Sequence, residues 1–271
     1  MQETALPHLL QHCHALAWHT LPPPQPMDVE RWSEAWADAL AQLNEFASHG
    51  YYGLDVPDLP PEQQRQAWQE WQQAARQSVH LLELAYQRGL PPTGLETLFG
   101  HVLHWCNEYA QTLRQAADAD ATPPALLEVA GTDYSAAVLL VALPVLLERQ
   151  ELIPGITQRL LGERCDRLLD YLSAAACDKS EAVEQVFRPE PYAALTPFFE
   201  QLDVTAGPLL QYLQQAYPAA QDCSCAWEVG ALVVLYGLDD GAFRQHPHYP
   251  AQLVDFARQR LQASYPQSLR A

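Results

Sequence analysis

Histidine side chains that could bind a metal or carry protons gather near the N-terminus of the chain. His8, His12, Cys13, His14 and His19 lie within twelve residues of one another. Histidine and cysteine are typical zinc ligands, but neither an HExxH motif nor paired CxxC motifs accompany them. We interpret this segment as a histidine-rich helix end at a surface or an interface, with a zinc site as the alternative.

A second group of reactive side chains lies in GLDDGAFRQHPHYPAQLVDFAR, residues 237–258. His246 and His248 can share a metal ion in a loop, yet no third or fourth ligand is evident beside them. Asp239 and Asp240 are adjacent, so their side chains point apart. A corner between two helices is the preferred interpretation, and a metal site is the weaker one.

Glu228 is the only charged side chain of CSCAWEVGALVVLYG, which reads as a helix buried on all sides. A buried carboxylate must be hydrogen-bonded or neutralised, so a catalytic acid is one interpretation. We prefer a structural anchor that accepts backbone N–H groups from the loop around Asp239. Gly237 would then end this helix, and Pro250 would lie in the first turn of the next.

No nucleophile–base pair, P-loop, dinucleotide fingerprint or kinase motif is present in the sequence. We therefore expect a binding protein and not an enzyme, with neither a cofactor nor a metal. The charge narrows the partners, because 33 acidic residues oppose 15 basic ones and give a formal net charge of −18. Direct binding to nucleic acid or to an anionic membrane is not expected, whereas a basic protein would be attracted. Solubility alone is the other explanation of the charge.

Helices must position these side chains, because apolar residues recur at helical spacing almost everywhere. Trp68, Trp71, Ala75, Val79 and Leu82 form one such stripe. Strand patterns are nearly absent, so the expected fold is all-α: a multi-helix bundle of two helical subdomains packed together.

The breaks along the chain predict its organisation. The segment ADADATPPA separates an N-terminal helical region, 1–122, from a C-terminal helical domain, 123–271. Asp28 is placed to cap one helix, and the spacing predicts a single helix over 156–171. The N-terminus lacks the pattern of a signal peptide and the apolar run 136–147 is too short to span a bilayer, so we expect a cytoplasmic protein.

The last 140 residues carry three motifs that together point to one family. They are a helix with Trp227, Glu228 and two small residues, a turn with Gly237, Asp239 and Asp240, and a helix start with Tyr249, Pro250 and Leu253. In this order they resemble the C-terminal domain of PoNi-type immunity proteins, the inhibitors of PoNe-type nuclease toxins. Cys223-Ser224-Cys225 stands where that family usually has Gly-Tyr-Trp, and His248 stands where it often has an aromatic residue.

The resemblance implies an immunity protein that binds and neutralises a secreted toxin, most directly a nuclease effector of a type VI secretion system. An acidic helical surface would then face the basic cleft of the nuclease. The candidate toxin-binding residues are Glu148, Glu151, Glu163, Asp166, Asp170, Glu181 and Glu184. The alternative interpretation is that these acidic faces are only exposed to water and bind no partner. A metal-binding helical enzyme and an acidic helical scaffold are the alternative functions, and a homodimer is left open.

Overall fold

The fold is known from a computed structural model. It describes residues 5–16, 18, 28–49, 58–116, 127, 133–162, 166–174, 176–177, 186–201, 204–218 and 225–264, except the side chains of 49 and 112–116. All regular secondary structure in these ranges is helical, so the all-α prediction is confirmed. Within the same ranges, no helix is long and apolar enough to cross a membrane.

The chain forms two compact units, which we call the N-terminal unit and the C-terminal unit. The N-terminal unit comprises residues 1–128 and 158–163, and the C-terminal unit comprises 129–157 and 164–271. Each unit is described below by itself.

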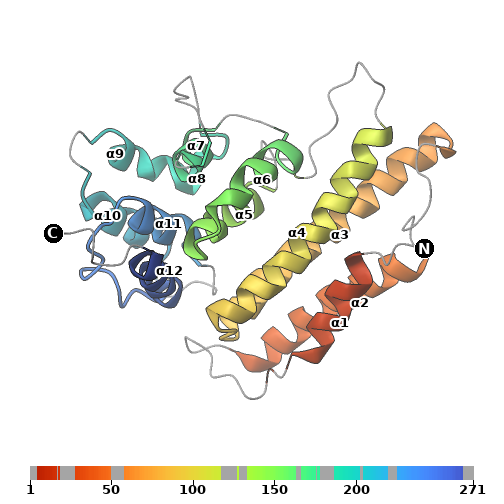
Figure 1. The fold of residues 1–271 in the computed structure, drawn as a ribbon, viewed down its shortest axis with the longest axis horizontal. Coiled ribbons are helices and arrows are strands. Elements are labelled where there is room, and N and C mark those ends of the chain that lie inside the picture. The colour runs from red at the N-terminus through yellow and green to blue at the C-terminus, as the bar shows by residue number, and fades with distance from the viewer. Residues whose placement is uncertain are drawn as a thin grey trace. The chain divides into compact units, whose positions relative to one another are not determined.

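Long helices build the described part of the N-terminal unit. They are α1 (Ala5–Ala15), α2 (Val29–His49), α3 (Pro61–Gln87) and α4 (Pro92–Ala116). Helices α3 and α4 form a hairpin, α2 packs on α3, and α1 packs on α4 (Figure 1). Gly89 lies in the turn of this hairpin with a φ of 91°, a conformation that other residues adopt only with strain. As expected, Asp28 caps α2, because its Oδ1 accepts the N–H groups of residues 30 and 31.

Stacked aromatic rings fill the core of the N-terminal unit. The ring of Trp71 stacks on the rings of Trp105 and Tyr109, with 5.4 Å and 4.6 Å between the ring centroids. Phe46 of α2 meets Trp71 edge-on at 5.4 Å. Trp105 is fully buried. The apolar stripes of three helices therefore meet in a single aromatic core, where offset and edge-to-face contacts are favourable.

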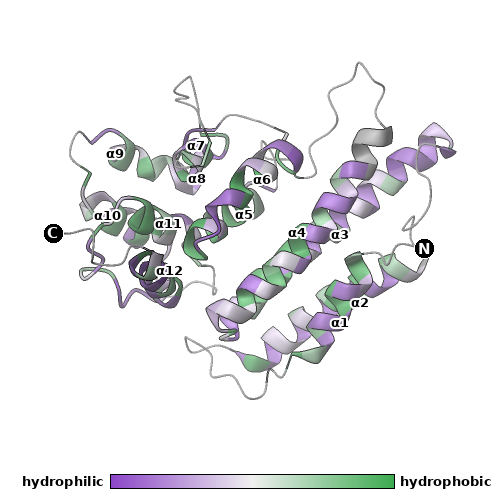
Figure 2. Ribbon diagram, in the orientation of Figure 1, coloured by the Kyte–Doolittle hydropathy of each residue, from purple (hydrophilic) through white to green (hydrophobic). Residues whose placement is uncertain are grey.

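Shorter helices build the C-terminal unit. They are α5 (Tyr134–Leu146), η3 (Gln150–Leu152), α6 (Ile153–Arg159, of which the last two residues are counted with the N-terminal unit), α7 (Arg167–Ser173), α8 (Pro189–Tyr192), η4 (Ala193–Leu195), α9 (Thr196–Phe199), α10 (Gly207–Ala216), α11 (Trp227–Leu235) and α12 (Ala251–Ser264). Helices α5 and α11 pack against each other, and α7 and α12 contact both. Figure 2 shows α11 as almost wholly hydrophobic, whereas hydrophobic and hydrophilic residues alternate along α3 and α4. A helix that is apolar on every side lies at the centre of its unit.

The single helix predicted over 156–171 is wrong. Helix α6 ends at Arg159, Gly162 follows with a φ of 68°, and α7 begins only at Arg167. Asp166 has an extended backbone and its side chain caps α7 by accepting the N–H of Leu169. A capping aspartate competes with continued helix for the backbone N–H groups, so the apolar spacing alone missed this break.

Candidate functional site

Glu228 is a buried anchor within the C-terminal unit, but its partners differ from those expected. It is 1% exposed, and its Oε1 accepts hydrogen bonds from Tyr212 Oη at 2.7 Å and Tyr217 Oη at 2.8 Å. Burial raises the pKa of Glu228, and the hydrogen bonds from these tyrosines oppose that rise only in part. The expectation that the loop around Asp239 supplies the donors is therefore wrong.

Asp166 is also a structural carboxylate. It is fully buried, and Tyr134 Oη donates to its Oδ1 at 2.7 Å. Its Oδ2 accepts the backbone N–H of Phe187 at 2.6 Å. The prediction that Asp166 lies on an exposed acidic face is wrong, because a helix-capping carboxylate is turned toward the backbone that it caps. This residue is not accessible to a partner protein.

Asp240 holds the corner that follows α11. Its carboxylate accepts hydrogen bonds from Tyr249 Oη at 2.8 Å, Arg244 Nη1 at 2.9 Å and Arg258 Nη1 at 2.9 Å. Burial alone would raise the pKa of Asp240, but the hydrogen bonds from Arg258 and Tyr249 and the charges of both arginines hold it below its ordinary value. Arg244 also contacts Asp255, and Arg258 donates to the carbonyl of residue 238 at 2.7 Å. The carboxylate of Asp240 therefore already accepts three hydrogen bonds from side chains of its own unit.

The remaining residues of the corner complete a tight helix–helix junction. Gly237 directly follows the cap of α11 with a φ of 60°. A Cβ placed on Gly230 would lie 2.4 Å from Cγ of Pro250, so α11 and the start of α12 approach closely only because Gly230 lacks a side chain. Leu253 is fully buried below this contact, and Trp227 is 3% exposed. Asp239, in contrast, is exposed, and its Oδ1 accepts the nearby N–H of Gly241 at 3.1 Å.

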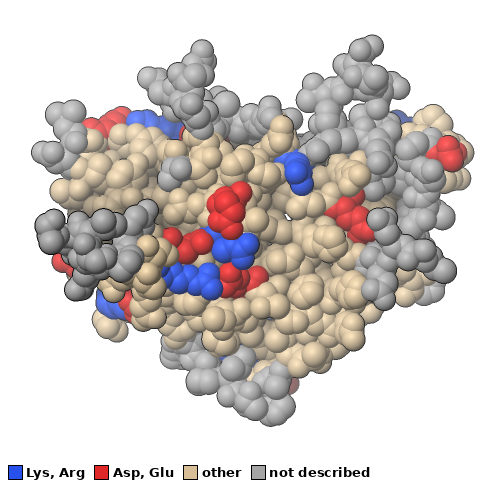
Figure 3. Space-filling view, in the orientation of Figure 1, with Lys and Arg blue, Asp and Glu red and all other residues tan. Residues whose placement is uncertain are grey.

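The acidic residues after α5 are interleaved with arginines. Arg149 Nε lies 2.6 Å from Glu151 Oε1. Glu148 is partly buried with a φ of 56°; burial raises its pKa, Arg260 lowers it, and Glu151 raises it further. Arg260 also donates to the carbonyl of Leu147 at 2.9 Å. Figure 3 shows acidic and basic side chains side by side over this part of the molecule, so this face is not a uniformly acidic one.

The other predicted acidic residues divide between described and undescribed segments. Asp170 lies in the first turn of α7 and is half-buried. Glu163, Glu181 and Glu184 lie outside the described residues. Only Glu148, Glu151 and Asp170 can therefore be placed as partly or fully accessible members of the predicted surface.

The histidines do not form a metal centre in the part of the chain that the structure describes. No group of three or more His, Cys, Asp and Glu side chains there could hold a metal ion. The rings of His246 and His248 lie 5.6 Å apart, and those of His12 and His101 lie 4.8 Å apart across α1 and α4. Burial lowers the pKa of His101, as do the charges of His12, His8 and His104. The packing of α1 on α4 is therefore most stable when the imidazole rings of His12 and His101 are uncharged.

Sequence reasoning missed the tyrosine partners of the buried carboxylates and the acidic side chains of α2 and α3. Tyr212 and Tyr134 lie 16 and 32 residues from the carboxylates that they bind. No local spacing connects them. For α2 a local pattern did exist, since Glu30, Glu34 and Asp38 recur every four residues and are all exposed.

The geometry thus defines a helical protein whose described buried carboxylates hold the fold together. Similarity to known proteins agrees with this class. The model of PoNe immunity proteins (PoNi), C-terminal, matches residues 164–253, and that of the PA2201 N-terminal domain-like family matches residues 2–122. A similar solved structure is "The Crystal Structure of Protein PA2201 from Pseudomonas aeruginosa", with 33% identity, a TM-score of 0.83, and coverage of 97% of this chain and 100% of that chain. No curated protein matches the chain. The chain belongs to the family of PoNe immunity proteins, with a PA2201-like N-terminal domain.

Proposed function

We propose that this immunity protein binds a secreted toxin in the cytoplasm and neutralises it by forming a stoichiometric complex. The observation that carries the proposal is the PoNi match over residues 164–253, which includes Glu228, Asp240 and Tyr249 of the structural corner. The protein blocks its target by occupying a surface and has no catalytic activity of its own. In support, Glu228 and Asp240 have several donors each, which suits an anchor better than an acid that exchanges protons.

We further propose that the toxin is a nuclease effector delivered by a type VI secretion system. Nucleases bind phosphates through basic clefts, and an acidic protein can compete for such a cleft. The formal net charge of −18 supports this choice. We also keep the division near residue 122 as the proposed boundary between the two domains.

Within the C-terminal unit, the proposed contact surface includes Glu148, Glu151 and Asp170, together with Glu163, Glu181 and Glu184. The exposure of Glu151, whose side chain is 61% accessible, supports its inclusion. Arg149 and Arg260 reduce the net charge of this face. Strong attraction of a basic toxin therefore requires acidic residues elsewhere as well.

Co-expression with the toxin encoded beside the gene tests the proposal. We expect the wild-type chain to restore growth and to co-purify with the toxin in a fixed ratio, more strongly at low salt than at high salt. A catalytically inactive toxin serves as the control for growth. If the chain neither restores growth nor co-purifies with the toxin at low salt, the proposed function is wrong.

A further inference from the structure

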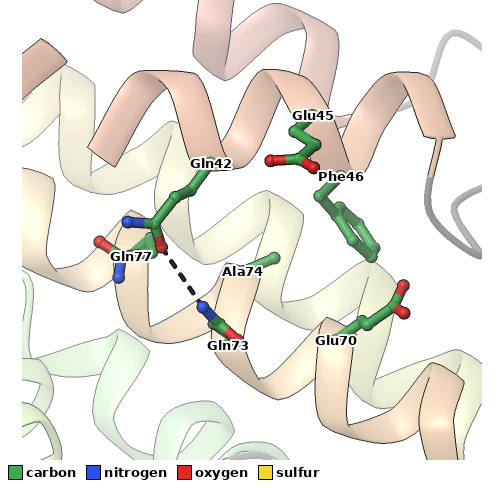
Figure 4. Close-up of a pocket in the computed structure, with 7 residues that line it drawn as sticks. All are labelled: Gln42, Glu45, Phe46, Glu70, Gln73, Ala74 and Gln77. Atoms are coloured by element: carbon green, nitrogen blue, oxygen red, sulfur yellow. Dashed lines mark hydrogen bonds between the residues drawn. The ribbon is translucent and has the colours of Figure 1, made fainter. Parts of the chain in front are cut away.

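A groove of about 320 Å³ lies on the surface of the N-terminal unit, between α2 and α3 (Figure 4). Its lining comes from both helices: Gln42, Glu45 and Phe46 of α2, and Glu70, Gln73, Ala74 and Gln77 of α3. Among the described residues that line it, none is a lysine or an arginine. The groove therefore combines a concave shape with a negative charge, and it belongs to neither of the surfaces described above.

The two ends of the groove differ in chemistry. Figure 4 shows the side chains of Glu45, Glu70 and Phe46 toward one end. The amides lie toward the other end, where Gln73 Nε2 donates to Gln42 Oε1 at 3.4 Å. One end thus offers carboxylates beside an aromatic ring, and the other offers amides that can both donate and accept hydrogen bonds.

The carboxylates at the acidic end keep most of their hydrogen-bonding capacity. Gln66 Nε2 donates to Glu70 Oε1 at 3.1 Å, which leaves Glu70 Oε2 for another donor. Among the described residues, no side chain is seen to donate to Glu45, which is exposed. A cation entering this end would therefore meet two carboxylates without displacing a strong ion pair.

The floor of the groove is held in place by the aromatic core. Phe46 is 7% exposed, and the centroid of its ring lies 5.4 Å from that of Trp71 and 5.9 Å from that of Trp105. Ala74, at 4% exposed, leaves the space that a larger side chain would fill. Because buried packing fixes this floor before any partner arrives, little ordering is required on binding.

The electrostatic field around α2 favours a positive partner. Glu30, Glu34, Asp38 and Glu45 are exposed along this helix, whereas Arg31 is its basic residue. Residues 1–130 contain 16 acidic and 5 basic residues. Such an excess attracts cations over several ångströms and increases the association rate of a basic protein.

We propose that this groove receives an arginine side chain of the toxin. The guanidinium group lies between Glu45 and Glu70, beside the ring of Phe46, and the glutamine amides bind the main chain beside that arginine. Arginine fits better than lysine because its planar group donates to two carboxylates at once and packs on aromatic rings. This inference rests on the proposed function and identifies the partner surface within it.

A pair of matched double variants tests the groove. Glu45→Arg with Glu70→Arg reverses the charge inside it, and Glu34→Arg with Glu62→Arg makes the same change on the same helices outside it. Affinity for the catalytically inactive toxin encoded beside the gene is measured at low salt. We expect the groove variant to bind at least about tenfold more weakly than the control variant, with both melting near the wild-type temperature.

The outcomes separate the groove from the proposed function. If the wild-type chain binds and protects while the groove variant binds as tightly as the control variant, the groove inference alone is overturned. If the wild-type chain does not bind the toxin, the proposed function fails and the groove inference fails with it. The neutral pair Glu45→Gln and Glu70→Gln should also weaken binding, which excludes a loss caused only by the introduced arginines.

A photo-crosslinking residue in place of Gln77 identifies the occupant directly. We expect the crosslinked toxin peptide to contain an arginine within a few residues of the attachment site. Attachment beside a lysine without any arginine, or no crosslink in a complex that still forms, would contradict the proposal. The same crosslinker in place of the exposed Glu62 provides the control for chance proximity.

Discussion

The two units of this protein use their carboxylates in opposite ways. In the C-terminal unit, the described residues include Asp133, Asp166, Glu228 and Asp240 as buried carboxylates. In the described part of the N-terminal unit no carboxylate is buried, and apolar and aromatic side chains make up most of the core. Hydrogen bonds to these buried carboxylates link the short helices of the C-terminal unit, as Asp166 links α7 to α5 and Glu228 links α11 to α10.

This difference indicates where binding can occur. A carboxylate that already accepts two or three internal hydrogen bonds has little to offer a partner, whereas an exposed one keeps its charge available. The long helices of the N-terminal unit, stabilised by aromatic packing, leave Glu45 and Glu70 at the surface. The comparison predicts that core substitutions act mainly on stability and that groove substitutions act mainly on affinity.

The largest expected effect is in the aromatic core of the N-terminal unit. Trp105→Ala should lower the free energy of unfolding by about 4 kcal/mol, because it removes a fully buried ring that stacks on Trp71. Denaturant unfolding followed by tryptophan fluorescence measures it in a Trp227→Phe background, where the remaining tryptophans all belong to the N-terminal unit. A loss below about 1 kcal/mol would show that this core does not depend on the stack.

Replacing Glu228 should have a somewhat smaller effect in the C-terminal unit. Glu228→Ala should cost about 3 kcal/mol, because the hydroxyls of Tyr212 and Tyr217 lose their acceptor. Glu228→Gln should cost less, since an amide oxygen still accepts. Thermal or denaturant unfolding compares the two variants; equal losses would contradict this prediction, because glutamine keeps both the size of the side chain and an acceptor oxygen.

The same residue gives a pH dependence with a defined sign. Because the pKa of Glu228 is raised in the folded state, folded molecules keep its proton at pH values where unfolded molecules have released it. Its contribution to stability should therefore fall as the pH rises above the ordinary value of 4.5. The difference in stability between wild type and Glu228→Gln, measured across this range, should reveal the effect, and parallel pH profiles would contradict it.

The same substitution, glycine to alanine, can be made inside one helix of each unit to compare the two units. Gly230→Ala should destabilise the C-terminal unit by about 2 kcal/mol, because the added Cβ meets Pro250 at 2.4 Å. Gly100→Ala in α4 should stabilise the N-terminal unit by up to about 1 kcal/mol, since nothing lies within 4 Å of the added Cβ. We expect the melting temperature to fall for Gly230→Ala and to rise for Gly100→Ala. Shifts of the same sign would contradict the difference between the two units.

The smallest expected effect is a loosening of α1 in acid. The pKa values of His12 and His101 are lowered, so protonating these rings favours the unfolded state. Stability should fall as the pH drops below 6.5, the ordinary value for histidine. Hydrogen exchange of α1 at pH 7 and pH 5 measures it, and the double variant His12→Gln with His101→Gln should show a weaker pH dependence.

Local features of the sequence predicted much of the fold. Apolar spacing indicated the long helix that carries Trp68 and Trp71 and the buried helix around Glu228, and Asp28 and Gly237 marked where helices begin or end. The motifs around Glu228 and Asp240 were sufficient to identify the family. These features are readable because helix periodicity, capping and positive φ depend on residues only a few positions apart.

The use of each carboxylate was decided by tertiary structure. The sequence marked Glu228 as buried but assigned it the wrong donors, and it placed Asp166 on a surface although Tyr134 and Phe187 enclose it. Glu45 and Glu70, 25 positions apart, line one groove only because α2 packs on α3. The sequence by itself determined an acidic, all-helical member of the PoNi family, whereas the packing of distant segments decided which acids became anchors and which remained at the surface. The reason is that the burial of a carboxylate and the hydrogen-bond donors around it depend on residues that are close in space. Helical spacing along the sequence does not encode these neighbours.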